Sequence, residues 1–467
     1  MKRTKYFFII FSIMLTACSV GPNYKEPDFN LPDKYDQQND TVSSETLDFV
    51  WWKNFNDKTL NYLVKKAIFN NKDVGQSLAR VNQARALARV ARAELLPGFQ
   101  INADFAKAQS AGARFPAGIN RNFRYEAYTS GIDATWEIDV FGRLRRNLEA
   151  ANADYNSRVA SLHDTLRILV SEVALNYFQL RENQRQLEIS NNNLKLQEET
   201  YNLVNLKYKS GVVGELDLHR SKSQLEQTKS LIPTLNAQIK SNIHRLSVLL
   251  GRQPQKLTKK LSKTKDIPSY QGTIKIGNPG EILKKRPDLI ARERELAYYT
   301  ALIGVNTGDL FPKISINGNV GYEARMFSDL GSKLSEVYAF SPSLSWTPFD
   351  FGSIRARIKN ADERATEALF NYEQSVLLAL EEVENALANF SAEREKVVYL
   401  QNSFEASKRA YQISKSQYQE GVIDFLTLLE SQKTLLETEQ NYTTGKFALS
   451  SSYIALYKAL GGGWGEV

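Results

Sequence analysis

The residue whose chemistry is easiest to assign is Cys18, the only cysteine among 467 residues. It follows a basic start and an apolar run over 6–17 that is too short to span a bilayer, a pattern typical of a signal peptide over 1–17. The run ends in LTAC, a lipoprotein cleavage box, so acylation explains a lone thiol here better than a spare buried cysteine does. We expect a diacylglycerol and an N-acyl chain on Cys18. Ser19, in place of Asp, favours sorting to the outer membrane.

Other reactive side chains do not form a recognisable active site. The Gly461-Gly462-Gly463 run lacks the preceding strand and following helix of a phosphate loop. No nucleophile has a plausible base. The histidines are dispersed without metal-ligand spacing: His163, His219 and His244. We therefore expect no enzyme activity, no metal and no cofactor other than the lipid on Cys18.

Charge and hydropathy restrict the function further. The formal charge of +8 falls to +5 without the three basic residues of the signal peptide, and the remaining charges are of mixed sign, so nucleic acid is not an expected partner. Beyond the signal, no apolar stretch approaches the roughly 20 residues of a membrane helix. Any further membrane crossing must use strands.

The elements that position these residues come from a tandem duplication. Asp73 and Pro97 recur 215 positions later as Asp288 and Pro312, whereas the later landmarks recur at 210, so the first copy carries five extra residues in between. The landmarks of the first copy are Trp136, Gly142, Tyr208, Gly211, Leu216 and Gly251, and those of the second are Trp346, Gly352, Tyr418, Gly421, Leu426 and Gly461.

Each copy contains 68 residues without glycine or proline, 143–210 and 353–420. As helices, at about 1.5 Å per residue, these would each be about 100 Å long. Heptads run through both and through the return helices, which predicts four supercoiled rods per chain. An ordinary long coiled coil fits these helices equally well. The heptad positions of the long helices are Leu166, Val173, Leu180, Leu187, Leu194, Tyr201 and Tyr208, then Val376, Val383, Phe390, Val397, Phe404, Tyr411 and Tyr418.

Alternating apolar and polar residues precede each long helix and predict one β-hairpin per copy. A sheet apolar on one face and polar on the other suits a transmembrane barrel, although a sandwich in water would alternate likewise. Four strands cannot close a barrel, and an open edge in hydrocarbon leaves backbone groups unsatisfied. The barrel must therefore be shared, by two chains with eight strands or three with twelve.

Aromatic and basic residues mark the ends of the hairpins. We predict that Trp136 and Trp346 lie in the interfacial aromatic belt of the membrane. Three arginines follow the first hairpin, Arg143, Arg145 and Arg146, and two follow the second, Arg355 and Arg357. They could extend towards lipid phosphates or form a solvated helix face, and the pattern favours neither.

The turns after the long helices form the other candidate site. Gly211 and Gly421 suit a left-handed helix C-cap, and the return helices begin near Gly214 and Asp424. Asp424 is a good N-cap residue, and around a symmetry axis its copies would form a carboxylate ring. Apolar residues at these turns would be unusual in solvent without a partner, although they could pack within the turn: Val212, Val213, Val422 and Ile423.

The chain resembles the TolC-like outer membrane factors, specifically their lipoprotein branch. The likeness runs nearly end to end. It rests on Trp136 with the following FGRLRR and on WWKNFNDKTL at 51–60, RPDLIARERELAYYTALIGVNTGDLFPKISI at 286–316, YKSGVVGELDL at 208–218 and YQEGVIDFLTLLESQ at 418–432.

The resemblance implies a homotrimer with a 12-stranded β-barrel, a 12-helix α-barrel in the periplasm and an equatorial belt. It implies that Asp424, with Glu430, lines a periplasmic gate. It also implies that a periplasmic adaptor, linked to an inner membrane pump, docks at the turns after the long helices, which we call the tips. The docking residues would be Gly211, Val212, Val213, Gly214, Leu216, Gly421, Val422, Ile423, Phe425 and Leu426.

The sequence therefore predicts a mainly α chain with transmembrane β-strands, anchored in outer membrane lipid. Its expected function is the exit duct of a tripartite efflux pump; the alternatives are the exit duct of a type I protein secretion system and a structural coiled-coil lipoprotein. The expected segments are the signal peptide (1–17), a lipid-anchored N-terminal and equatorial segment (18–72), a first repeat (73–251) with hairpin 98–140, long helix 142–210 and return helix 215–250, an equatorial inter-repeat segment (252–287), a second repeat (288–461) with hairpin 313–349, long helix 352–420 and return helix 424–460, and a tail (462–467).

Overall fold

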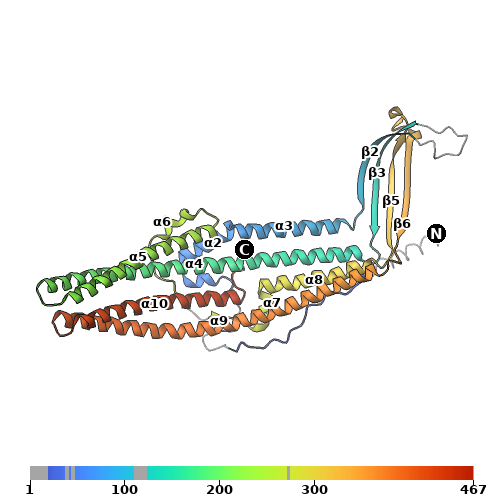
Figure 1. The fold of residues 1–467 in the computed structure, drawn as a ribbon. Helices are drawn as coiled ribbons and strands as arrows, with labels where there is room; N and C mark the ends of the chain where they lie inside the picture. The colour runs from blue at the N-terminus through green and yellow to red at the C-terminus, as the bar shows by residue number, and fades with distance from the viewer. Residues whose placement is uncertain (1–18, 37–41, 44–47, 110–123, 271–273, 466–467) are drawn as a thin grey trace. The chain divides into compact units, whose positions relative to one another are not determined.

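The computed structural model describes residues 19–36, 42–43, 48–109, 124–270 and 274–465 (Figure 1). The expected signal peptide, Cys18 and residues 110–123 of the first predicted hairpin lie outside these residues. The chain divides into two compact units, one of residues 1–28, 80–158 and 291–372 and one of residues 29–79, 159–290 and 373–467. Each unit draws on both sequence repeats, so the duplication is not the structural division.

Two pairs of helices repeat with equal lengths. α4 (Arg143–Lys209) and α9 (Ser353–Gln419) each have 67 residues, and the return helices α5 (Glu215–Leu249) and α10 (Phe425–Ala459) each have 35. The predicted ends are confirmed to within one residue. A helix of 22 residues precedes each hairpin, α3 (Lys72–Ala93) and α8 (Pro287–Gly308).

The hairpins join into one antiparallel sheet in the first unit, in the order β2-β3-β5-β6. Its strands are β2 (Gly98–Gln109), β3 (Arg124–Ile138), β5 (Lys313–Ala324) and β6 (Glu336–Ser345), with the short helices η4 (Phe327–Asp329) and η5 (Lys333–Ser335) between the last two. Gly131 pairs with Gly321 at the centre. A Cβ on Gly131 would lie 2.9 Å from the carbonyl oxygen of Val320, so the close approach of β3 and β5 requires glycine.

In the second unit, η1, α4 and α10 pack around a core of aromatic rings. Trp51 is fully buried in η1 (Trp51–Phe55), and its ring centroid lies 6.2 Å from that of Tyr453 on α10. The ring centroid of Phe55 lies 4.8 Å from that of Phe178 on α4 and 5.0 Å from that of Tyr453. Trp51 and Phe55 of the WWKNF sequence therefore anchor the N-terminal segment to helices of both repeats.

Short elements complete the second unit. α2 (Lys58–Asn70) follows η1, and the inter-repeat segment forms η3 (Pro254–Leu257), α6 (Thr258–Leu261), β4 (Ile274–Lys275) and α7 (Pro279–Lys285). β1 (Val42–Ser43) pairs in parallel with β4. The N-terminal and inter-repeat segments, which we predicted separately, are thus joined. Among the described helices, none has an apolar stretch long enough to span a membrane.

Candidate functional site

The sheet has one apolar and one polar face, as the alternation predicted. One cross-strand row is Ile101, Ile132, Val320 and Tyr338, and all four side chains are exposed. The neighbouring row on the opposite face contains Gln100, Asp133, Asn319 and Ala339. Within this chain no described element covers the apolar row, whose exposed fractions reach 80% at Ile101 and 88% at Tyr338.

Both edges of this sheet are open. β2 pairs only with β3, and β6 pairs only with β5, within the part of the chain that the structure describes. Ten residues or more in each edge strand therefore present one row of backbone N–H and C=O groups without a strand partner. A sheet of this kind requires further strands before it can enter hydrocarbon.

The two hairpin tryptophans make equivalent contacts. The Trp136 Nε1–H donates to the Leu95 carbonyl at 3.0 Å, and the Trp346 Nε1–H donates to the Leu310 carbonyl at 3.0 Å. Each indole thus caps the segment that ends the helix before its own hairpin. Both rings remain partly exposed, so the predicted aromatic belt stays a prediction, but the N–H group is directed at the protein backbone.

The three arginines after the first hairpin all have partners within the protein. Arg143 makes a bidentate ion pair with Glu137, and Arg145 pairs with Asp139. Arg146 is 2% exposed, and the expected lipid-facing or solvated position is wrong for it. Sequence periodicity missed this role because an arginine run carries no sign of a distant partner.

Arg146 instead holds the N-terminal segment. Its Nε donates to the Val20 carbonyl at 2.9 Å, and its Nη2 donates to the Gly21 carbonyl at 3.2 Å and to Asn23 Oδ1 at 2.7 Å. Nη1 pairs with Glu149. The Val20 N–H also donates to the Phe141 carbonyl at 3.0 Å. Residues 20–23 are thus fixed to the junction between β3 and α4.

The turns after the long helices have the predicted geometry. Gly211 (φ 73°) and Gly421 (φ 78°) are left-handed, and the following N–H groups, of Val212 and Val422, donate back to Lys207 and Gln417. Gly214 is the N-cap of α5 and supplies no side chain, whereas Asp424 caps α10 by accepting from the Thr427 N–H at 3.0 Å. The two turns therefore share a backbone and differ in charge.

Asp424 is exposed, and its carboxylate accepts hydrogen bonds from both the hydroxyl and the N–H of Thr427. These bonds, with a smaller contribution from the charge of Arg220, hold the pKa of the Asp424 carboxyl below its usual range. Glu430 is also exposed, six residues further along the chain on α10. The cap predicted for Asp424 is confirmed, and the role of both carboxylates in a gate stays a prediction.

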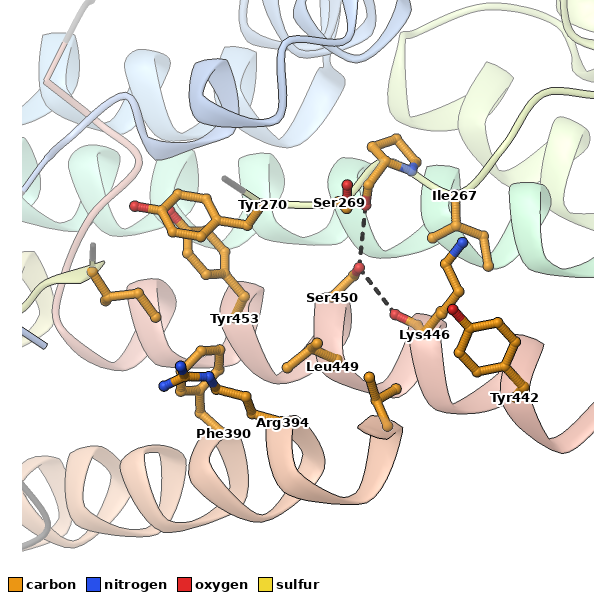
Figure 2. Close-up of a pocket in the computed structure, with 13 residues that line it drawn as sticks. Ile267, Ser269, Tyr270, Phe390, Arg394, Tyr442, Lys446, Leu449, Ser450 and Tyr453 are labelled. Carbon is orange, nitrogen blue, oxygen red and sulfur yellow. Dashed lines mark hydrogen bonds between the residues drawn. The ribbon is translucent and has the colours of Figure 1, made fainter. Parts of the chain in front are cut away.

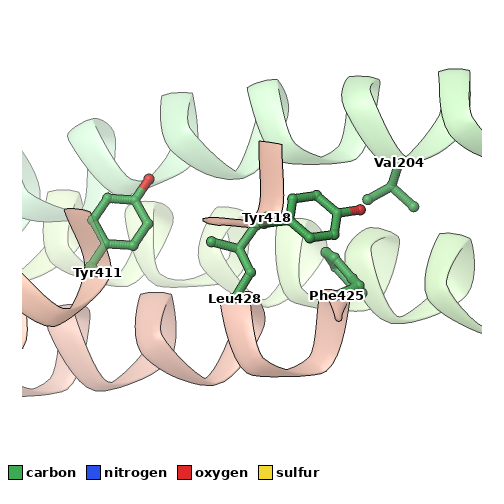
Figure 3. Close-up of a cluster of buried hydrophobic side chains, with 5 residues drawn as sticks. All are labelled: Val204, Tyr411, Tyr418, Phe425 and Leu428. Atoms are coloured by element: carbon green, nitrogen blue, oxygen red, sulfur yellow. The ribbon is translucent and has the colours of Figure 1, made fainter. Parts of the chain in front are cut away.

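A buried cluster connects the tips of the two repeats (Figure 3). It consists of Val204 on α4, Tyr411 and Tyr418 on α9, and Phe425 and Leu428 on α10. Lys207 lies over the Tyr418 ring, 4.1 Å from its centroid. The helices of both repeats are therefore packed together near their turns.

The cluster separates the apolar tip residues into two groups. Val213 and Ile423 pack against the cluster, which is the alternative of packing within the turn, and Phe425 is buried in the cluster. Val212, Leu216, Val422 and Leu426 are exposed, between 45% and 68%. Among the predicted docking side chains, these four are the ones free to meet a partner.

Arg286, the C-cap residue of α7, is buried against the C-terminal end of α10, and the sequence did not predict this contact. Arg286 donates to the Ala459 carbonyl at 2.8 Å and pairs with Asp288 at 2.6 Å and Glu382 at 2.7 Å. Burial would raise the pKa of Asp288, but the hydrogen bonds and charge of Arg286 hold it below its usual range. Arg167 reaches the Lys458 carbonyl at 2.6 Å. Two arginines thus satisfy the C-terminal carbonyls of α10.

Among the described residues, no group of three or more histidine, cysteine, aspartate or glutamate side chains could hold a metal ion. The candidate functional features are the two-faced sheet and the helix turns. A two-faced sheet with open edges, continuous in sequence with helices of 67 residues, defines the class of outer membrane channels.

Comparison with known proteins agrees with that class. The family described as outer membrane efflux protein matches residues 63–252 and 278–462, and the chain belongs to this family. Nodulation protein T of Rhizobium leguminosarum bv. trifolii is 30% identical, with 100% of this chain and 99% of the relative aligned. The cation efflux system protein CusC of Escherichia coli K12 is 27% identical over 97% of this chain and 98% of its own length.

The structure is likewise similar to a solved outer membrane channel, OprN, with a TM-score of 0.90 and 37% identity over 96% of this chain and 100% of that one. The predicted family, fold and outer membrane location are confirmed by these findings. The chain is an outer membrane efflux protein.

Proposed function

We propose that three copies of this chain form the exit duct of a tripartite efflux pump, with one closed barrel of twelve strands above a tunnel of twelve helices. The observation that carries the proposal is the two-faced sheet with two open edges. Edge-to-edge pairing between copies would satisfy the backbone groups of β2 and β6 and place the row from Ile101 to Tyr338 against lipid. The polar face would then line water.

The number of copies rests on the resemblance to TolC-like channels, because pairing of edges alone permits two or three. The efflux role is supported by the family and by relatives such as CusC, a cation efflux system protein, and TtgF, a toluene efflux pump protein. Neither the structure nor these relatives favour protein secretion, and a structural coiled coil would not require a sheet with an exposed apolar face.

The proposed anchor is an acyl group on Cys18. The clamp of Arg146 on residues 20–23 supports this assignment, because it fixes the chain just after the acylated position beside the strands. The lipid would add attachment to the membrane without closing the barrel. Mass spectrometry of the N-terminal peptide would detect the acyl chains, and an unmodified peptide would remove the anchor.

The proposed inner end of the duct is the pair of helix turns. The exposed Val212, Leu216, Val422 and Leu426 would contact a periplasmic adaptor, and Asp424 with Glu430 would set the charge at the narrowest point. Cysteine at position 422 should form crosslinks to an adaptor in cells. Cysteine at the half-buried position 213 serves as the matched control, with much lower yield.

The decisive experiment measures stoichiometry and conduction together. Native mass spectrometry of the membrane-extracted protein should give three copies, and planar bilayers should show discrete conducting steps. A stable monomer that forms no pore would overturn the proposal, and a conducting dimer would retain the duct but correct the number of copies.

A further inference from the structure

The second unit contains a cleft that none of the helix-turn residues line. It has a volume of about 470 Å³ and lies between α9, α10 and the inter-repeat residues 267–270 (Figure 2). This volume is within the range of small-molecule sites. Ser450 joins two of its walls, since its hydroxyl contacts the carbonyl oxygens of Pro268 at 3.2 Å and Lys446 at 3.1 Å.

The inner surface of the cleft is apolar and consists of buried side chains. Ile267, Ile274 and Phe390 line it and are at most 8% exposed. Tyr453 is 1% exposed, and its ring lies 4.2 Å from that of Tyr270. Such a surface can receive a hydrocarbon chain or ring without rearrangement.

Two basic side chains line the cleft, and no acidic side chain lines it with them. Arg394 on α9 and Lys446 on α10 line it, and none of its thirteen lining residues is an aspartate or glutamate. Within the described chain neither cation has a salt bridge; the Lys446 ammonium lies over the Tyr442 ring, 5.8 Å from its centroid. Elsewhere on α9, by contrast, Lys359 and Lys396 are paired with neighbouring carboxylates.

We propose that this cleft binds amphiphilic anions, with a carboxylate or phosphate group at one of its two cations, Arg394 or Lys446, and a hydrocarbon part against Phe390, Ile267 and Leu449. Charge complementarity selects the anion, and the apolar floor selects the chain. A bound molecule would connect the inter-repeat segment to both helices of the second repeat, so occupancy would stabilise their packing.

Binding can be measured on the full-length protein in nanodiscs of zwitterionic lipid. The probe is 11-(dansylamino)undecanoate, whose emission rises and shifts to the blue in an apolar site. We expect saturable binding that decanoate displaces, whereas decyltrimethylammonium, with the same chain length and opposite charge, and acetate, with no chain, do not displace it. Decyl phosphate should compete as well as decanoate, because either anionic group can pair with an arginine or a lysine.

Three variants separate the cleft from partition into lipid. R394Q with K446Q should weaken binding by roughly tenfold or more, as expected for loss of charge-assisted hydrogen bonds. L449W should abolish binding by filling the apolar floor without altering charge. R409Q, which removes an exposed cation of α9 outside the cleft, should bind like the parent. Equal binding by all variants, or displacement by the cationic amphiphile, would overturn the proposal, as would no saturable binding to the assembled protein.

Discussion

Trp346 is hydrogen-bonded to Leu310, with its indole N–H 3.0 Å from the Leu310 carbonyl oxygen, and Trp136 makes the same contact with Leu95 in the first repeat. Each bond joins the last part of a hairpin to the end of the preceding helix. The same device was therefore kept in both copies even though their hairpins differ by five residues.

Replacing Trp346 by phenylalanine should lower the stability of the junction. The ring contacts are largely kept, so the expected loss is that of one hydrogen bond, about 1 kcal/mol, and the double variant with W136F should lose about twice as much. Thermal denaturation of the purified protein measures it. F349L, a change to an exposed ring nearby, should leave the midpoint unchanged. An unchanged midpoint in W136F/W346F would contradict the structural role.

The long helices and their ends could be predicted because each depends on local sequence. α4 and α9 are long because they contain no glycine or proline. Gly211 and Gly421 end these helices through their left-handed backbone, and Asp424 begins α10 through its side-chain cap. The role of Arg146 could not be predicted, because the partners through which it holds the N-terminal segment lie more than 120 residues away and are mostly backbone carbonyls. The pairing of β1 with β4 is equally invisible, since strands of two residues have no period.

The exposure of individual side chains at the helix turns could not be predicted from the sequence either. Val212 and Val213 are adjacent and identical in type, yet the first is exposed and the second packs against the cluster of Val204, Tyr411, Tyr418, Phe425 and Leu428. The direction of each side chain depends on how the helices of the second repeat approach α4. Sequence could therefore identify the turn as a site but not select its free side chains.

The two faces of the sheet should respond oppositely to charge. Val320 and Asn319 are neighbours on β5 and point to opposite faces. V320K would place a cation against lipid, at a cost of about 2–4 kcal/mol per copy near the bilayer centre. We expect loss of the assembled form on semi-native gels. N319K should assemble normally, and equal assembly of both variants would argue against a lipid-facing row.

Arg146→Gln should release the N-terminal segment. The variant loses the bonds to Val20, Gly21 and Asn23, and the expected cost is about 1–3 kcal/mol because these buried groups lose a charged donor. Trypsin should then cut faster at the exposed Lys25.

The matched control is R158Q, which removes an exposed arginine of the same helix that pairs with Asp154. G304A gives a second test without removing charge, because a Cβ there would lie 2.7 Å from Cγ of Arg146. Unchanged cleavage in both R146Q and G304A would show that the segment is held by other contacts.

Glu182 should make the stability of the helical unit depend on pH. Burial raises the pKa of its carboxyl above 4.5, although Gln186, Thr444 and Gln179 donate hydrogen bonds to it. The folded chain then holds this proton at pH values where the unfolded chain releases it. The free energy of unfolding therefore falls as pH rises from about 4.5 through the raised pKa.

E182Q should remove this part of the dependence, which melting temperatures between pH 4.5 and 7 would measure. The exposed Glu188 of the same helix provides the control variant, E188Q, whose profile should follow the parent. If E182Q and the parent had parallel profiles, the burial of this carboxyl would not influence stability.

Substitutions at Asp424 can separate its cap from its charge. Asparagine caps a helix about as well as aspartate, so D424N keeps the bond to the Thr427 N–H and removes only the negative charge, whereas D424A removes both. If three copies of Asp424 surround the duct axis, both variants should alter conductance and reduce the preference for cations in planar bilayers, because the field of the carboxylate ring is lost. D424A should also loosen the first turn of α10, because the cap bond to the Thr427 N–H is lost, and hydrogen exchange at residues 425–428 should become faster. E430Q tests the second predicted gate residue on the same helix, and its effect should be smaller if the ring lies at the turn. A change in D424A but none in D424N would assign Asp424 to the cap alone, because the charge would then have no part in conduction.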